Sequence, residues 1–299
     1  MVVVLVLGPA TAALAVELDE LLEQSRSASY TAEQIISCST PDGVRDGLVR
    51  IEQNGGELRL TSAVDDDVEV ATGAGTWSVS REGGLVSEAS VTSGSEKDEP
   101  LYTVEDGRRV QFLGRNAMSY RLVRDGELRA ELVFDDATRA LVQATTYAGE
   151  DVYCQRRFVT FDPEAPELEV TAMVEDPTVP SAVEDSSLPI EVAGFERLDH
   201  YVDDDGVEFA YYSDGFFSFA LFETPSKVTL DDGVSIDLDS GRYEREFTAG
   251  QVSYAWETRE GGVALVGDLP PDLHEEVLAA MPAPDHRGLF RRWWRSLFG

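Results

Sequence analysis

The chain has 299 residues, enough for two ordinary domains, and 42% of them are hydrophobic, which is compatible with a folded core. Its 57 acidic and 24 basic residues give a formal net charge of −33. Such an excess of negative charge argues against binding to nucleic-acid phosphates by the body of the protein, and it opposes contact with anionic membranes.

Residues 1–15, MVVVLVLGPATAALA, form an apolar run that ends in a small-x-small pattern typical of a signal-peptidase site. The run is too short for a membrane-spanning helix, which needs roughly 20 residues. It carries no Lys or Arg, with which a signal peptide normally begins. We therefore expect residues 1–15 to be a signal-peptide remnant of an exported protein. The alternative is a buried N-terminal strand.

Residues 16–27 are predicted to form an amphipathic helix, because Leu18, Leu21 and Leu22 share one face. Strands then follow, and 48–53 and 57–64 form a hairpin across Asn54-Gly55-Gly56. The other strands expected in this part are 30–37, 68–70 and 76–80. The Ser- and Glu-rich segment 87–99 is predicted to be a loop.

From residue 111 the pattern becomes regular, with turn signals roughly every 10 to 13 residues. The expected strands are 111–113, 117–124, 128–134, 140–147 and 153–161. Apolar and charged residues alternate in several of them, which is typical of a sheet with one solvated face. The pattern predicts one antiparallel meander that completes a first domain over residues 16–162.

Residues 163–188 contain four prolines and many acids without periodicity, which indicates a linker. A second domain is expected over residues 189–284. Its most apolar stretch, YYSDGFFSFALFETP (211–225), is predicted to be a buried strand with a bulge or tight bend at Asp214-Gly215. Further strands are expected at 227–230, 235–238, 241–248, 251–258 and 262–266. A helix should open at Pro270-Pro271 with Asp268 as its cap.

Two cysteines, Cys38 and Cys154, lie on predicted strands near the two ends of the first domain. Their spacing fits neither a metal site nor a Cys-x-x-Cys motif. In an exported protein such a pair can form one disulfide, worth about 3–5 kcal/mol through loop closure. The sequence leaves the bridged and the free states equally open.

The last segment, residues 285–299, has a different character from the rest of the chain. As a helix it would place aromatic residues, including Trp293 and Trp294, on one face, and Arg291, Arg292 and Arg295 on the other. A basic helix with an aromatic face suits a membrane interface or the groove of an acidic partner. Docking on the acidic body of this chain and disorder are the alternatives.

Motifs of catalysis are missing from the sequence. The three histidines, His200, His274 and His286, have no neighbours at metal or triad spacing. There is no Gly-x-Ser-x-Gly elbow and no phosphate-binding glycine loop. We therefore expect no enzyme activity, no metal and no cofactor.

Several short segments resemble the RseB/MucB family, extracytoplasmic regulators of the sigma-E type of envelope-stress response. Residues 212–216, YSDGF, followed by FALFE at 219–223, are similar to the YSDGL…SVF strand of the family's C-terminal domain. The flanking segments agree in order: Leu188-Pro189 with Gly194-Phe195, then 254–257, 267–270 and 280–282. Residues 113–147 resemble the N-terminal domain of the family and lipoprotein-carrier folds in general.

The resemblance covers residues 17–284 and implies an α+β, mostly β fold. An unclosed, curved antiparallel β-barrel would pack on helices around an apolar cavity, beside a smaller C-terminal antiparallel sheet with a helix. The cavity is expected to involve Trp77, Tyr102 and Phe112. A partner-binding surface is expected at four residues that could equally be core: Tyr212, Asp214, Phe216 and Phe217.

By the same resemblance, the protein would bind the extracytoplasmic segment of an anti-sigma factor and shield it from proteolysis. The cavity would sense a lipid or a peptide. The alternative function is a lipid or lipoprotein carrier of the cell envelope that has no regulatory partner.

Overall fold

The structure is a computed structural model that describes residues 17–55, 57–62, 68–71, 76–81, 84–90, 101–167, 188–202, 206–230, 232–248 and 250–285. The strands between residues 68 and 90 are described by their backbone alone. The expected leader (1–15), most of the expected linker and all but the first residue of the C-terminal segment lie outside the described residues, as do residues 91–99 of the expected loop.

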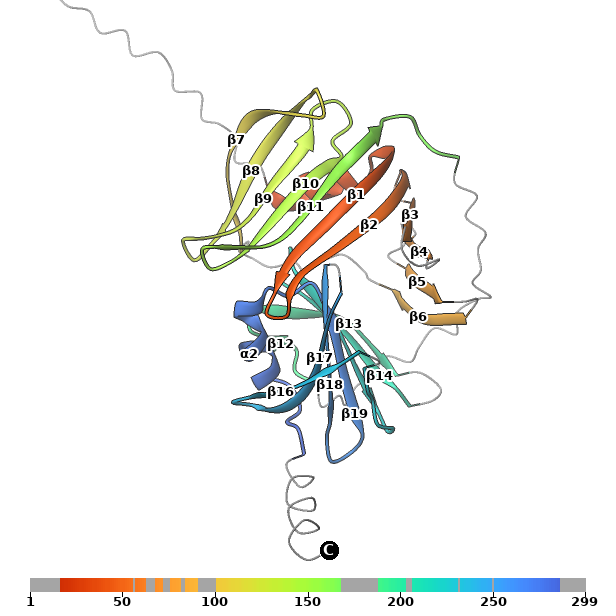
Figure 1. Ribbon diagram of the computed structural model, residues 1–299, viewed down its shortest axis with the longest axis vertical. Coiled ribbons are helices and arrows are strands. Elements are labelled where there is room, and N and C mark those ends of the chain that lie inside the picture. Colours follow the sequence, from red (N-terminus) through yellow and green to blue (C-terminus); the bar gives the residue numbers. More distant parts are fainter. Residues whose placement is uncertain are drawn as a thin grey trace, which may run out of the picture.

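The first of two antiparallel sheets has eleven strands in the order β6-β5-β4-β3-β2-β1-β11-β10-β9-β8-β7 (Figure 1). Its strands are β1 (Ser29–Thr40), β2 (Gly43–Asn54), β3 (Glu57–Ser62), β4 (Val68–Ala71), β5 (Thr76–Arg81), β6 (Gly84–Ser90), β7 (Thr103–Phe112), β8 (Arg115–Arg124), β9 (Glu127–Asp135), β10 (Leu141–Ala148) and β11 (Asp151–Asp162). The end strands β6 and β7 are not paired with each other in the described part of the chain, so the sheet is curved but open.

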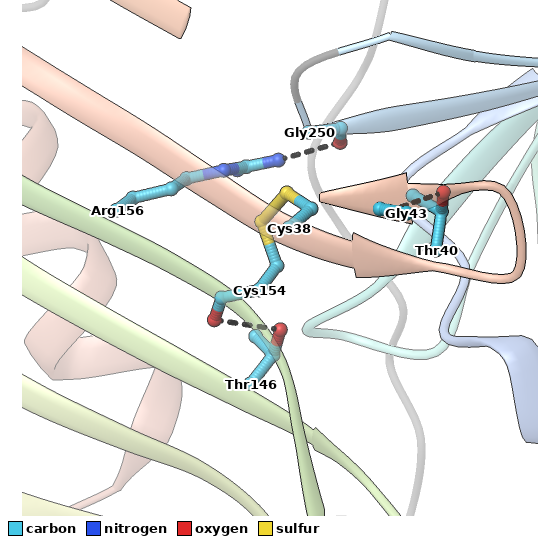
Figure 2. Close-up of a disulfide and its surroundings, with 7 residues drawn as sticks. All are labelled: Cys38, Thr40, Gly43, Thr146, Cys154, Arg156 and Gly250. Carbon is cyan, nitrogen blue, oxygen red and sulfur yellow. Dashed lines mark hydrogen bonds between the residues drawn. A yellow bond between two sulfur atoms is a disulfide. The ribbon is translucent and has the colours of Figure 1, made fainter. Parts of the chain in front are cut away.

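One seam holds the two halves of this sheet together. Every neighbouring pair of strands is consecutive in the chain except β1 and β11. Their pairing runs from Thr31 opposite Asp162 to Cys38 opposite Cys154, and the two cysteines form a disulfide at its end (Figure 2). The disulfide closes 116 residues of chain, and the two cysteines, expected near the two ends of the first domain, meet in the middle of its sheet.

Helix α1 (Leu18–Arg26) packs on the first sheet through its apolar face. Leu18 and Leu21 are buried in one cluster with Leu122 and other side chains of β8 and β9. The last carbonyls of the helix have no partner within the helix, and Gln53 of β2 supplies one, since its Nε2 donates to the carbonyls of Ser25 and Arg26, each at 2.7 Å.

The second sheet has eight strands in the order β12-β13-β14-β15-β19-β18-β17-β16. They are β12 (Glu191–Val192), β13 (Phe195–Val202), β14 (Glu208–Ser213), β15 (Ser218–Thr224), β16 (Val234–Leu238), β17 (Gly241–Thr248), β18 (Gln251–Glu257) and β19 (Gly262–Gly267). Helix α2 (Pro271–Ala279) packs on this sheet through Val277 and Leu278, which lie in its core. Two meanders thus meet at β15 and β19.

Several expected elements differ in the structure. The apolar stretch 211–225 belongs to two strands, β14 and β15, and not to one, and the tight bend expected at Asp214-Gly215 is part of the hairpin turn between them. Strand β13 was not expected, β7 is much longer than expected, and residues 87–90 are strand, not loop. Residues 227–230 are not a strand, and Asp268 does not cap α2, because its side chain accepts the Ser218 N–H instead.

The fold class is confirmed: the described chain is mostly β, with two antiparallel sheets and helices α1 and α2. The expected domain boundaries remain predictions. Within the described ranges, no helix is long and apolar enough to cross a membrane.

Candidate functional site

A cavity of about 290 Å³ lies where α1 and the first sheet meet the second sheet. Strands of the first sheet contribute apolar side chains, among them Tyr30, Ile51 and Phe158. The second sheet contributes Phe216 and Phe217 from the β14–β15 turn. The volume is at the lower end of the range for small-molecule pockets, about 300–1,000 Å³. Residues of both sheets and of the turns between their strands thus form its walls.

At the end of the cavity near α1, the polar side chains of Tyr30, Gln53 and Ser25 are already hydrogen-bonded within the protein. Tyr30 donates its hydroxyl proton to Gln53 Oε1 at 2.9 Å, and Gln53 in turn donates to the end of α1. Ser25 Oγ accepts the Leu141 N–H at 3.0 Å. Burial raises the pKa of Tyr30, so its hydroxyl stays protonated. This end of the cavity is therefore suited to an apolar group.

The opposite end carries charge. Arg156 of β11 donates from Nη2 to the carbonyl of Gly250, in the β17–β18 turn, at 2.9 Å (Figure 2). Asp268 is half-buried here; burial raises its pKa, and the positive charge of Arg156 acts in the opposite direction. Tyr153 is buried beside them, and its burial raises its pKa to about 12. An arginine has five N–H donors, so Arg156 keeps donors for a ligand.

The β14–β15 turn forms a second point of contact between the sheets. Asp214 is buried there, with four donors around its carboxylate. Its Oδ1 accepts the N–H groups of Phe216 at 3.0 Å and Phe217 at 2.8 Å, which closes the turn. Its Oδ2 accepts from the Tyr102 hydroxyl at 2.5 Å and from Arg124 Nη1 at 3.0 Å. Tyr102 directly precedes β7 and Arg124 ends β8, so both come from the part of the chain that forms the first sheet. Burial, with the charge of Asp214 adding to it, raises the pKa of Tyr102.

Two further ion pairs join the sheets. Arg129 of β9 is buried and binds Asp272 of α2 in a bidentate pair, at 2.6 and 3.3 Å. Arg245 of β17 binds Asp42, at the tip of the β1–β2 hairpin, at 3.3 Å. Together with Arg124 and Arg156, four arginines of a strongly acidic chain lie at this junction. We call the contacts made by Asp214, Gly250, Asp272 and Arg245 the sheet junction.

The residues expected at the cavity lie elsewhere or outside the description. Tyr102 belongs to the sheet junction, where its ring also packs edge-on against Phe216 with centroids 5.9 Å apart. Phe112 is half-buried at the end of β7 and does not line this cavity. The side chain of Trp77 lies outside the described part. Their role as cavity residues stays a prediction.

The four residues expected at a partner surface are enclosed in this structure. Tyr212 is fully buried, stacks on Phe219 and donates its hydroxyl proton to the Pro189 carbonyl. Asp214 and Phe217 are also buried, and Phe216 and Phe217 line the cavity. They act here as core and junction, the alternative that the sequence left open, and their binding of a partner stays a prediction.

The sequence did not single out Arg156 or Gly250, and it assigned Asp268 to a helix cap and not to the charged end of the cavity, which these three residues form. A lone arginine in a strand and a glycine in a turn carry no site signal by themselves. In the described residues no cluster of three or more His, Cys, Asp or Glu side chains could hold a metal ion. The tail residues Arg291, Arg292, Trp293, Trp294 and Arg295 lie outside the described residues.

No family model matches the sequence, and a search of curated proteins found no match. Among solved structures, the chain is similar to MucB. It is 16% identical to a protein in the complex of Pseudomonas aeruginosa MucA and MucB, over 90% of this chain and 98% of that one, with a TM-score of 0.46. A crystal structure of MucB alone is 18% identical over 88% and 95% of the two chains, with a TM-score of 0.49.

A LolA superfamily protein from Nitrosomonas europaea is 9% identical over 87% and 97% of the two chains, with a TM-score of 0.22. MucB carries the name of the family that the sequence motifs resemble. Because all three TM-scores lie below 0.5, the function has to be argued from this chain's own residues.

Proposed function

We propose that the protein is an extracytoplasmic regulator that binds the outer segment of a membrane anti-sigma factor and shields it from proteolysis. Its cavity would sense a lipid or a peptide. The observation that carries the proposal is the place of the family-like motifs. Phe216 and Phe217 follow the YSDG turn, Asp268 belongs to the GDLP segment, and all three line the cavity on the side of the second sheet.

This arrangement supports a regulator whose two activities are coupled. A ligand in the cavity contacts Phe216 and Phe217, whose N–H groups are held by Asp214. Asp214 also binds Tyr102 and Arg124, so a shift of this turn alters the sheet junction. A ligand and a partner that favour different junction geometries weaken each other's binding by the same factor.

Export is part of the proposal. The small-x-small end of residues 1–15 and the Cys38–Cys154 disulfide both support an oxidising compartment outside the cytoplasm.

The experiment uses the outer segment of a membrane anti-sigma factor from the same genome. Calorimetry should detect binding to the full-length protein, and the bound segment should resist its site-specific protease. Failure to bind would remove the regulator function. A cavity-filling variant, Ala144→Phe, should lose binding of the dye 1,8-anilinonaphthalene sulfonate and uncouple dye from partner. Val152→Phe is the matched control, because Val152 is 48% exposed and does not line the cavity.

The apolar end of the cavity also favours the second candidate, a carrier of acyl chains. Mass spectrometry of natively purified protein should then find a copurified acyl ligand, and no anti-sigma segment should bind. Membrane contact through residues 285–299 is a separate proposal. Removing those residues should abolish sedimentation with anionic vesicles if the contact exists.

A further inference from the structure

The Cys38–Cys154 disulfide occupies a singular position in the first sheet. It joins the last pair of the β1–β11 seam, and that seam is the one pairing that links the halves of this sheet in the described residues. Beyond this pair, β1 continues with β2 alone, and β11 continues with β10. The disulfide therefore closes one end of the seam, and strand pairs separate from their ends.

The next residue pair of the seam on the same face as the cysteines contacts the second sheet. Residues two apart on a strand point to the same face, and two positions from the cysteines Ile36 lies directly opposite Arg156. Arg156 binds the Gly250 carbonyl. A Cβ atom at Gly250 would lie 3.0 Å from Arg156 Nη2 and 3.3 Å from Ile36 Cγ2, so the turn sits tightly on both side chains. The disulfide thus lies two positions from the residue pair that the Gly250 turn contacts.

The same end of the seam reaches the second sheet once more. Strand β1 passes from Cys38 into the hairpin tip, where Asp42 binds Arg245. The disulfide consequently lies between two contacts of the sheet junction, as Figure 2 shows for Arg156 and Gly250 on one side and the Thr40–Gly43 tip on the other.

The disulfide also borders the cavity. Cys38 and Cys154 are 1% and 5% exposed, so the outer surface offers almost no access to them. Cys154, however, is part of the cavity wall. The cavity is therefore the side on which a small thiol would meet the bond, and a ligand in the cavity would cover it.

We propose that the Cys38–Cys154 disulfide is a redox-sensitive clamp on the sheet junction. A dithiol reductant attacks one sulfur as its thiolate, and a mixed disulfide forms. The second thiol of the reductant then resolves it, so the reductant leaves as a disulfide and the protein gains two electrons and two protons as two thiols. Two thiols cannot approach as closely as two bonded sulfurs, so the two strands move apart at this end of the seam. The Gly250 turn then loses its close contact with Ile36 and Arg156. The clamp does not depend on the proposed anti-sigma partner.

Hydrogen exchange of the full-length protein tests the clamp before and after treatment with dithiothreitol, with thiol alkylation and mass spectrometry to score reduction. Reduction should speed exchange in the β17–β18 turn at least tenfold and leave the β14–β15–β19 core unchanged. The variant Cys38→Ala/Cys154→Ala should exchange like the reduced protein, and dithiothreitol should not change its exchange rates. A bond that native protein keeps intact in excess dithiothreitol, or unchanged exchange after reduction, overturns the proposal.

Because the double cysteine variant could fail to fold, a second variant tests the same contact with the disulfide intact. Arg156→Gln should speed exchange in the β17–β18 turn by itself, and reduction should add little to it, since both changes release the same contact. Arg157→Gln is the matched control: Arg157 is the next residue of β11 and exposed. Full additivity of Arg156→Gln and reduction would contradict the clamp.

Discussion

Asp214 offers the sharpest test of how the two sheets are held together. Its carboxylate is fully buried, whereas the side chain of Arg124, 3.0 Å away, is 19% exposed. In Asp214→Asn the amide oxygen still accepts the two N–H groups of the turn. The second oxygen becomes an NH₂ group, which faces the Arg124 guanidinium with a donor and no charge.

The expected decrease in the free energy of unfolding follows from the interactions that Asp214→Asn removes. A hydrogen bond to a charged group contributes about 1.5–3 kcal/mol, and leaving one partner of a buried pair costs about 3–5 kcal/mol. Arg124 keeps some contact with water, which places the expected loss near the lower end, at about 3 kcal/mol. Tyr102 retains a polar neighbour, so it adds little.

Urea denaturation gives the difference in free energy of unfolding, provided that the slopes agree between variants. Asp125→Asn is the control on the same arginine, because Asp125 is 91% exposed and lies 3.7 Å from Arg124. It should change stability by less than about 0.5 kcal/mol. If both substitutions cost the same, the carboxylate of Asp214 does not hold the junction and the reasoning is refuted.

Three further predictions concern the junction and the core of the second sheet. Burial lowers the pKa of His274 to about 4, so between about pH 6.5 and 4 the unfolded chain binds a proton that the folded chain does not. The stability advantage of wild type over His274→Gln should thus fall by up to ~3 kcal/mol on acidification through that window, and a pH-independent difference in urea titrations would contradict this. Gly250→Ala should destabilise the protein by about 1–2 kcal/mol more than Gly215→Ala in thermal unfolding. Both glycines have φ above +90°, but only a Cβ at position 250 would contact side chains of the other sheet. Equal losses would refute this close contact. Asp272→Ala should lower the free energy of unfolding by roughly 1–2 kcal/mol more than Arg129→Met in denaturant titrations, because it leaves a guanidinium that is only 6% exposed without its partner carboxylate. The opposite order would exclude a tight pair.

Local features of the fold could be predicted because their signals are local. The turn at Asn54-Gly55-Gly56 needs a residue with positive φ, and Gly55 adopts 59°. The alternation in 117–124 and 128–134 marks strands β8 and β9 directly. Strands without regular alternation were missed or predicted too short. Strand β13, with sequence FERLDHYV, mixes charged and apolar residues, and β7 is an edge strand with the charged run EDGRR.

For the candidate site, the sequence indicated the turn around Asp214 but not the residues that contact it. The motif around Asp214 stood out in the sequence, but its partners Tyr102 and Arg124 are 112 and 90 residues away. Burial of an acidic turn depends on which donors another part of the chain brings to it, and no pattern within the turn encodes that. Arg156 and Gly250 come together across 94 residues for the same reason.

Composition, strand periodicity and turn residues already specified a mostly β chain of two meander-rich parts with one pair of cysteines, because each of these depends on neighbours within a few residues. The tertiary structure alone decided that β1 meets β11, that the disulfide lies at the end of this seam, and that four arginines join the two sheets. Hydrophobic alternation determines which face of a strand is buried, but it does not determine which strand pairs with it. Pairing between distant segments is chosen by packing and charge in three dimensions, and the cavity exists only once that choice has been made.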